Sequence, residues 1–179
     1  MKPFIEKLPL SDNTSFVART YRTPHFEVPW HQHIEYELIL FTEGEGKAFI
    51  GNYIGEFKTG DVFFLGSNLP HTFQKAHRDL ITSAVVVQFR DTFWGHTFLE
   101  LPECKSVRKL FEISGQGLKM GATARQQLAP KIKELEHLQD FSRIIRLCEC
   151  IQLLATTQDY ECTSTLDEKM FQARNRDRI

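Results

Sequence analysis

Several features are scarce in this 179-residue sequence, and each scarcity excludes a class of protein. No stretch approaches the roughly 18 consecutive apolar residues of a membrane-spanning helix. The first ten residues also lack the apolar core of a signal peptide. The net charge of -1 provides no surplus of Lys and Arg for contacts with nucleic-acid phosphates. We therefore expect a cytoplasmic chain that does not itself bind DNA.

Cysteine is also scarce and is confined to the C-terminal half, at Cys104, Cys148, Cys150 and Cys162. A Cys-x-Cys pair within a helical pattern is poorly placed for a disulfide and lacks the spacing of a zinc knuckle. We therefore expect all four cysteines to be reduced and to pack as small apolar side chains.

Strand signals dominate residues 14 to 90. Five segments are alternating or short apolar runs rich in β-branched and aromatic residues: SFVARTYR, YELILF, KAFI, DVFFLG and AVVVQF. Gly51 and Asn52 separate two of them and predict a tight hairpin, because these residue types tolerate positive φ. Short strands divided by regular turn signals predict a sandwich or a barrel.

After about residue 95 the spacing between apolar residues changes from that of a strand to that of a helix. Apolar residues recur every three to four positions in residues 128–138 and 141–155, and a shorter helix is expected over 106–114. The short gap between the two longer helices predicts a helical hairpin. From about residue 158 the pattern becomes polar, as in a linker. The fold class is therefore mainly β with C-terminal α.

Polar residues occupy every second position of one predicted strand, at His31, His33, Glu35 and Glu37. Alternate residues of a strand share one face, and an HxH pair places two imidazoles about 7 Å apart at their Cα atoms. A mixed set of imidazole and carboxylate ligands suits Zn, Ni, Fe or Mn. The same side chains could instead line a metal-free pocket for an organic ligand, or simply satisfy one another.

The spacing of these residues resembles the first cupin motif: His31, His33, Glu37 and then Gly44. A second motif begins at Gly60 and ends at His71, in GDVFFLGSNLPH. The resemblance implies a cupin-like double-stranded β-helix, or jelly-roll barrel, with a divalent transition metal held by His31, His33, Glu37 and His71. The chain departs from the second motif at Gly66, Asn68 and Lys75, so metal and metal-free pockets both stay open.

A wider resemblance covers nearly the whole chain. The chain resembles the N-terminal half of AraC-type transcriptional regulators. The features that carry this resemblance are the HxHxxYEL segment, the Gly-x-Gly pair, the SNLPH segment, the helical pair and the RDRI ending. This implies a sensing barrel over residues 1–100, a helical dimerisation segment over 101–160 and a linker beginning at 161–179. A helix-turn-helix DNA-binding domain would follow outside the chain.

The function implied is ligand sensing and homodimerisation, without enzyme activity. A small polar effector, such as a sugar, would contact His31, His33, Glu37, His71 and Arg19. The alternative is a metal-dependent cupin enzyme, a dioxygenase or a sugar isomerase, that uses the His31, His33, Glu37 and His71 set. The second long helix is apolar on more than one side, which predicts a twofold contact. Its expected interface residues are Phe141, Ile144, Leu147, Cys148 and Ile151.

Overall fold

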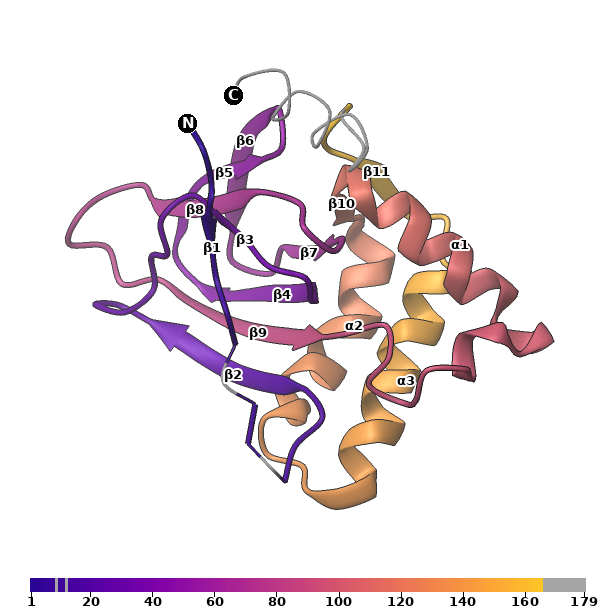
Figure 1. Cartoon of the computed structure of the whole chain (residues 1–179). Coiled ribbons are helices and arrows are strands. Elements are labelled where there is room, and N and C mark those ends of the chain that lie inside the picture. The colour runs from indigo at the N-terminus through magenta and orange to yellow at the C-terminus, as the bar shows by residue number, and fades with distance from the viewer. Residues whose placement is uncertain (9, 12, 166–179) are drawn as a thin grey trace.

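The computed structural model describes residues 1–8, 10–11 and 13–165 and consists of three layers. A six-stranded β-sheet lies in the middle, with a five-stranded sheet against one face and helices against the other (Figure 1). In the described part of the chain, no helix has both the length and the apolar character required to cross a membrane.

The five-stranded sheet is antiparallel except at its edge, where the N-terminal strand β1 pairs in parallel with β3. Its strands, in order across the sheet, are β1 (Phe4–Ile5), β3 (His31–Gln32), β8 (His71–Lys75), β5 (Glu45–Ile50) and β6 (Tyr53–Lys58). The turn between β5 and β6 is the expected two-residue hairpin, since Ile50 pairs with Tyr53. Gly51 adopts a positive φ of 56° there.

The six-stranded sheet is antiparallel, and its central strands are buried on both faces. Its strands, in order, are β11 (Tyr160–Cys162), β10 (Leu118–Met120), β7 (Val62–Leu65), β4 (Tyr36–Glu43), β9 (Ser83–Phe89) and β2 (Val17–Arg22). Along β4, Leu38 and Leu40 pack toward the helices, whereas Ile39 and Phe41 pack toward the other sheet. Burial on both faces explains why these strands read as continuous apolar runs.

Three α-helices cover the outer face of the six-stranded sheet and share one hydrophobic core with it. They are α1 (Lys105–Ile113), α2 (Ala122–Leu135) and α3 (Asp140–Thr156), accompanied by the short 3-10 turns η1 (Phe98–Glu100), η2 (Pro102–Cys104) and η3 (Ser114–Gln116). Helices α2 and α3 pack side by side as the predicted hairpin (Figure 1).

The predicted fold class is confirmed: strands β1 to β9 form the N-terminal half, and the helices follow, with the short strands β10 and β11 among them. Of the two predicted arrangements, a sandwich and a barrel, the sandwich fits better, because the strands of the described residues pair into two separate sheets. The four cysteines, all within the described part of the chain, are free as expected.

The segment expected to begin a linker is folded up to residue 165. Strand β11 extends the six-stranded sheet, and Asn52 in the β5–β6 turn binds the chain beyond it. The Asn52 Oδ1 atom accepts hydrogen bonds from Ser164 Oγ at 2.8 Å and from the Thr165 backbone N–H at 3.0 Å. The rest of the expected linker lies outside the described residues.

The Gly-x-Gly pair of the first motif turns the chain from one sheet into the other. Gly44 has a φ of 88°, which places it in the left-handed region that glycine favours. At Gly46 an added Cβ would lie 1.9 Å from the carbonyl oxygen of Gln74 on the neighbouring strand. The second glycine is therefore required by the close approach of two backbones.

Candidate functional site

The polar segment does not form the single strand that its alternation predicted. His31 lies on β3 in the five-stranded sheet, whereas Glu37 lies on β4 in the six-stranded sheet, with a bend at residues 34–35 between them. His71 pairs with His31 across the β3–β8 ladder. Because the chain crosses between the sheets here, the side chains of His31, His33, Glu37 and His71 still meet between them.

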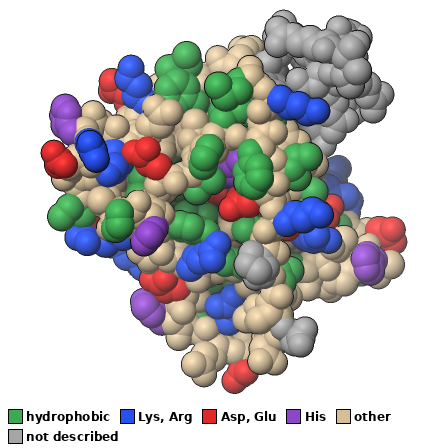
Figure 2. All heavy atoms as spheres, turned by 60° about the vertical axis from the view of Figure 1, so that its left-hand side comes forward, with side chains coloured by type: hydrophobic (Ala, Val, Ile, Leu, Met, Phe, Trp, Pro, Cys, Tyr) green, Lys and Arg blue, Asp and Glu red, His purple; other side chains and the backbone are tan. Residues whose placement is uncertain are grey.

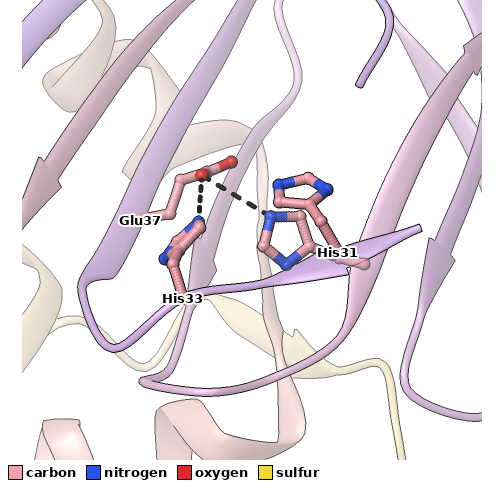
Figure 3. Close-up of side chains that lie close together, drawn as sticks. His31, His33 and Glu37 are labelled. Carbon is pink, nitrogen blue, oxygen red and sulfur yellow. Dashed lines mark hydrogen bonds and ion pairs between the residues drawn. The ribbon is translucent and has the colours of Figure 1, made fainter. Parts of the chain in front are cut away.

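His31, His33, Glu37 and His71 form a buried cluster. One potential ligand atom from each residue lies within 4.8 Å of the other three. The Glu37 Oε2 atom is 3.0 Å from His33 Nε2 and 3.5 Å from His71 Nε2. Figure 3 shows His31 on β3, His33 in the segment between β3 and β4, and Glu37 on β4 with their side chains close together.

Backbone carbonyls orient all three imidazoles. The Nδ1 atoms of His31, His33 and His71 lie 2.7, 3.0 and 2.7 Å from the carbonyl oxygens of Pro29, Glu35 and Leu69. A carbonyl oxygen can only accept, so each Nδ1 carries a proton, and Nε2 is the ring atom left to bind an ion. Those Nε2 atoms face Glu37 or Glu6, and His33 Nε2 donates a 3.0 Å hydrogen bond to Glu37 Oε2.

The charges of the cluster are strongly coupled. Burial lowers the pKa of His31 to about 4, and the charge of His71 adds to this effect. Burial opposes ionisation of His33, but the hydrogen bond and charge of Glu37 outweigh it and raise the His33 pKa. Burial alone would raise the pKa of Glu37, yet His71 and His33 hold it well below its usual range. Glu37 is therefore the anionic centre of the cluster.

The donor set fits a divalent transition metal. Metal bonds of about 2.0–2.2 Å place neighbouring ligand atoms about 2.8–3.6 Å apart, a range that includes both Glu37–His distances. His71 Nε2 is buried and has no hydrogen-bond partner, so this ring atom has room for a further partner such as an ion. Three imidazoles and one carboxylate suit the metals expected from the sequence.

The cavity beside the cluster includes residues that are not in the predicted site set, although alternation on the first strand already indicated that Tyr21 could face the pocket. Glu6, Tyr21 and Gln88 line it together with His31, Glu37 and His71. Gln88 donates a 2.9 Å hydrogen bond from Nε2 to Glu37 Oε2, and burial raises the pKa of Tyr21. Alternation along β9 is the signal that could likewise have identified Gln88. Glu6 has no local signal, because the β1–β3 pairing brings it here.

Arg19 and Glu35 lie apart from the proposed ligand atoms. Arg19 is exposed, and its guanidinium lies over the ring of Tyr21, 4.7 Å from the centroid. Glu35 is buried, with Oε1 3.6 Å from Arg90 Nε and Oε2 3.8 Å from His33 Nδ1. Arg19 therefore contacts Tyr21, a residue that lines the cavity, but does not line the cavity itself.

The five expected interface residues of α3 lie on different sides of the helix. Leu147 and Ile151 are buried within the chain and are unavailable to a partner. Ile144 and Cys148 are half-buried, and Phe141 is 67% exposed. Ile145, which was not among the five, is 49% exposed.

Two mainly antiparallel sheets that enclose a His, His, Glu, His cluster define a cupin-like domain. Residues 13–86 match the family model described as the AraC-like ligand binding domain. This match confirms the predicted resemblance to AraC-type regulators over that part of the chain. A search of curated protein sequences found no significant match.

The fold of one solved structure resembles that of this chain at low sequence identity, and others are more distant. ToxT from Vibrio cholerae O395, bound to (E)-4-(8-methylnaphthalen-1-yl)but-3-enoic acid, is 13% identical with a TM-score of 0.51. That alignment covers 92% of this chain and 66% of ToxT. ToxT from V. cholerae strain SCE256, bound to an unsaturated fatty acid, is 14% identical, with 81% and 54% covered and a TM-score of 0.49.

A cupin 2 conserved barrel domain protein from Rhodopseudomonas palustris is 21% identical, with 47% of this chain and 59% of that chain covered and a TM-score of 0.39. The present chain thus spans between about half and two thirds of the length of the ToxT structures.

Proposed function

We propose that this chain is the ligand-sensing and dimerisation domain of a cytoplasmic AraC-type transcriptional regulator. A small molecule would bind between the two sheets and control DNA binding by a domain outside the chain. The observation that carries the proposal is that residues 13–86, which match the ligand-binding family, contain the buried polar cluster. A ligand can act in this way only if it binds two arrangements of the domain with unequal affinity.

Successive segments of the chain would have different roles. Residues 1–100 would sense the ligand at His31, His33, Glu37 and His71, directly or through a metal, and residues 101–160 would dimerise. The helices share a continuous core with the six-stranded sheet, so a shift of that sheet would be transmitted to them. Residues 161–179 would lead toward the DNA-binding domain.

A fusion experiment tests this proposal. The chain would replace the dimerisation domain of a repressor whose DNA-binding domain acts only as a dimer, upstream of a reporter gene. We expect repression that depends on the chain and changes when a ligand of the cluster is supplied. Divalent metal salts, sugars and a long-chain fatty acid would be tested as ligands. Absence of repression, together with a monomeric chain in sedimentation, would contradict the proposal.

The cluster geometry also favours a second candidate, a metal-dependent cupin enzyme. Bound at His31, His33, Glu37 and His71, Fe(II) or Mn(II) would supply Lewis-acid or redox chemistry at positions left open by the protein. Oxygen consumption by the metal-loaded chain, or isomerisation of a sugar, would support this candidate. Reporter control without turnover would support the sensing domain instead.

A further inference from the structure

The segment that follows β11, residues 163–165, is bound by two different parts of the fold, and we call it the exit segment. From one side, the carbonyl of Gln116 in η3 accepts a 2.7 Å hydrogen bond from the Ser164 backbone N–H. From the other side, Asn52 in the β5–β6 turn binds Ser164 and Thr165. The exit segment is therefore held both by the five-stranded sheet and by the turn that precedes β10 of the central sheet.

Two glycines leave space for the exit segment. A Cβ added to Gly51 would lie 2.5 Å from Ser164 Oγ, and a Cβ added to Gly117 would lie 2.6 Å from Thr163 Oγ1. Ser164 is only 2% exposed. The exit segment is therefore packed closely against its two neighbours, and its hydrogen bonds are shielded from water.

The side chain of Asn52 completes this contact. Its Nδ2 atom donates a 2.6 Å hydrogen bond to Thr165 Oγ1, while its Oδ1 atom accepts from Ser164 Oγ and from the Thr165 N–H. Gly51 supplies the positive φ of the turn, whereas Asn52 does not have one. The backbone of the turn thus does not require asparagine at position 52. We call these three side-chain hydrogen bonds the Asn52 latch.

Residues 66–71 contact the polar cluster through their backbone. The Asn68 N–H donates a 2.7 Å hydrogen bond to the His33 carbonyl, and the Leu69 carbonyl lies 2.7 Å from His71 Nδ1. Asn68 is one of the departures from the second cupin motif, and it has a positive φ of 56°. The conformation of residues 66–71 therefore depends on where His33 and His71 lie.

The same residues contact the turn that carries the latch. The Pro70 carbonyl accepts a 2.8 Å hydrogen bond from the Gly51 N–H, and His71 pairs with Ile50 across the β5–β8 ladder. Asn52 follows Gly51 directly in the chain. Hydrogen-bonded backbone therefore runs without a break from the His71 imidazole to the Asn52 latch.

A ligand could act on this connection at His71, which lines the cavity between the sheets. Figure 2 shows a face on which hydrophobic side chains surround a small area with visible acidic and histidine atoms, so polar side chains are accessible there. A ligand bound to the His71 ring would restrict the ring and the Leu69 carbonyl that holds it. Residues 66–71 would then have less conformational freedom left to lose when the latch closes.

We propose that the Asn52 latch is the output of the ligand site: a ligand at His71 strengthens the hold of the β5–β6 turn on the exit segment and so fixes how the chain leaves the domain. This inference rests on the proposed sensing function and adds the route by which the ligand acts. Coupling between two sites is reciprocal, so loss of the latch weakens ligand binding by the factor by which the ligand strengthens the latch.

Hydrogen exchange of the Thr165 amide in the complete chain measures the latch, because this N–H is bound to Asn52 Oδ1. The first experiment needs no ligand. His71→Ala removes the bond to the Leu69 carbonyl, and we expect exchange at Thr165 to become about fivefold faster or more, the lower end of typical coupling. His31→Ala is the matched control, because it removes an imidazole of the same cluster that is held by the Pro29 carbonyl, and it should have little effect.

The second experiment tests reciprocity with Zn(II) as the probe of the cluster. We expect Zn(II) to slow exchange of the Thr165 amide and Asn52→Ala to lower the Zn(II) affinity by the same factor, about fivefold or more. Thr59→Ala is the control, since it removes a 3.0 Å side-chain hydrogen bond to the Gly44 carbonyl at the opposite end of the β5–β6 hairpin. This variant should bind Zn(II) as the wild type does.

The outcomes separate the latch from the sensing function. Unchanged exchange at Thr165 in His71→Ala would overturn the latch and leave the sensing function to the fusion experiment. Equal Zn(II) affinity in Asn52→Ala and the wild type would also overturn it. His71→Ala decides for a chain that does not bind Zn(II), and the Zn(II) titration decides if that variant does not fold. Faster exchange in His71→Ala, in a chain that fails to control the reporter, would support the latch and contradict the sensing function.

Discussion

His31 is the cluster residue whose ionisation has the clearest effect on stability. Its folded-state pKa of about 4 lies below the ordinary value of 6.5 because the ring is buried near His71. Between these pH values the unfolded chain binds more protons than the folded chain, so the free energy of unfolding rises with pH. Stability that is present above pH 6.5 is thus lost as the pH falls toward 4.

We predict that the metal-free chain loses up to about 3 kcal/mol of stability through His31 between pH 7 and pH 4, at about 1.4 kcal/mol per pKa unit. His31→Asn removes the titration and keeps a side-chain N–H for the Pro29 carbonyl. Urea unfolding in the presence of a chelator would measure both proteins across this range. The variant should lose correspondingly less stability, and identical pH slopes would contradict the prediction.

A second prediction at the residue scale concerns Gly46. In Gly46→Ala the new Cβ would collide with the Gln74 carbonyl, and separating β5 from β8 should cost about 3 kcal/mol. Gly60→Ala is the control, since its φ of 93° is unfavourable but no other heavy atom lies near its added Cβ. The control should lose only about 1–2 kcal/mol in thermal unfolding. A similar loss in both variants would show that backbone conformation, not the close approach, dominates.

At the scale of elements, α3 has a face toward the core and a face toward solvent. Leu147, Cys150, Ile151 and Leu154 are buried against the sheet and the other helices. Phe141 and Ile145 lie one turn apart and are exposed, so they continue the apolar stripe onto the outer face. The apolar surplus seen in the sequence therefore has two explanations, burial within the chain and an outer apolar patch.

We predict that Phe141→Glu combined with Ile145→Glu converts a dimer to a monomer in sedimentation, because two charges would face the partner. The melting temperature of the monomer should change little, since both side chains are exposed. Gln152→Glu places one charge at an exposed position of the same helix and serves as the control. An unchanged dimer in the double variant would place the contact elsewhere. Substitution of Leu147 would not be informative, because a buried charge there would unfold the chain.

At the scale of the whole molecule, Asp61 connects the layers. It is buried in the turn between β6 and β7, and its Oδ2 atom accepts a 3.0 Å hydrogen bond from the Lys58 backbone N–H. Its Oδ1 atom is 3.1 Å from Arg125 on α2, and its Oδ2 atom is 3.7 Å from Lys119 on β10. One carboxylate thus joins the end of the five-stranded sheet to the central sheet and to a helix.

We predict that Asp61→Asn lowers the free energy of unfolding by about 2 kcal/mol, the range for hydrogen bonds to a charged group. Glu43→Gln breaks the exposed pair with Arg22 and should cost less than about 1 kcal/mol. Urea unfolding of both variants would measure the difference. Equal small losses would show that solvent compensates the buried carboxylate.

Local patterns in the sequence were sufficient for the elements and for part of the site. The two-residue hairpin, the apolar strands and the helical hairpin follow from turn chemistry and from periods of two and 3.6 residues. His31, His33 and Glu37 were identified by alternation, but His71 needed the resemblance to a second motif. Alternation succeeded although the strand is broken, because the bend at residues 34–35 keeps the odd-numbered side chains buried.

The sequence by itself determined the fold class, the order of the elements and the donor types near one strand, because these depend on near neighbours in the chain. Only the tertiary structure decided which distant groups meet. Glu6 reaches His31 through the β1–β3 pairing, Asp61 reaches Arg125 through packing of α2 on the sheet, and α3 buries Leu147 but exposes Phe141. Contacts between residues far apart depend on how sheets and helices pack together, and no local pattern encodes that geometry.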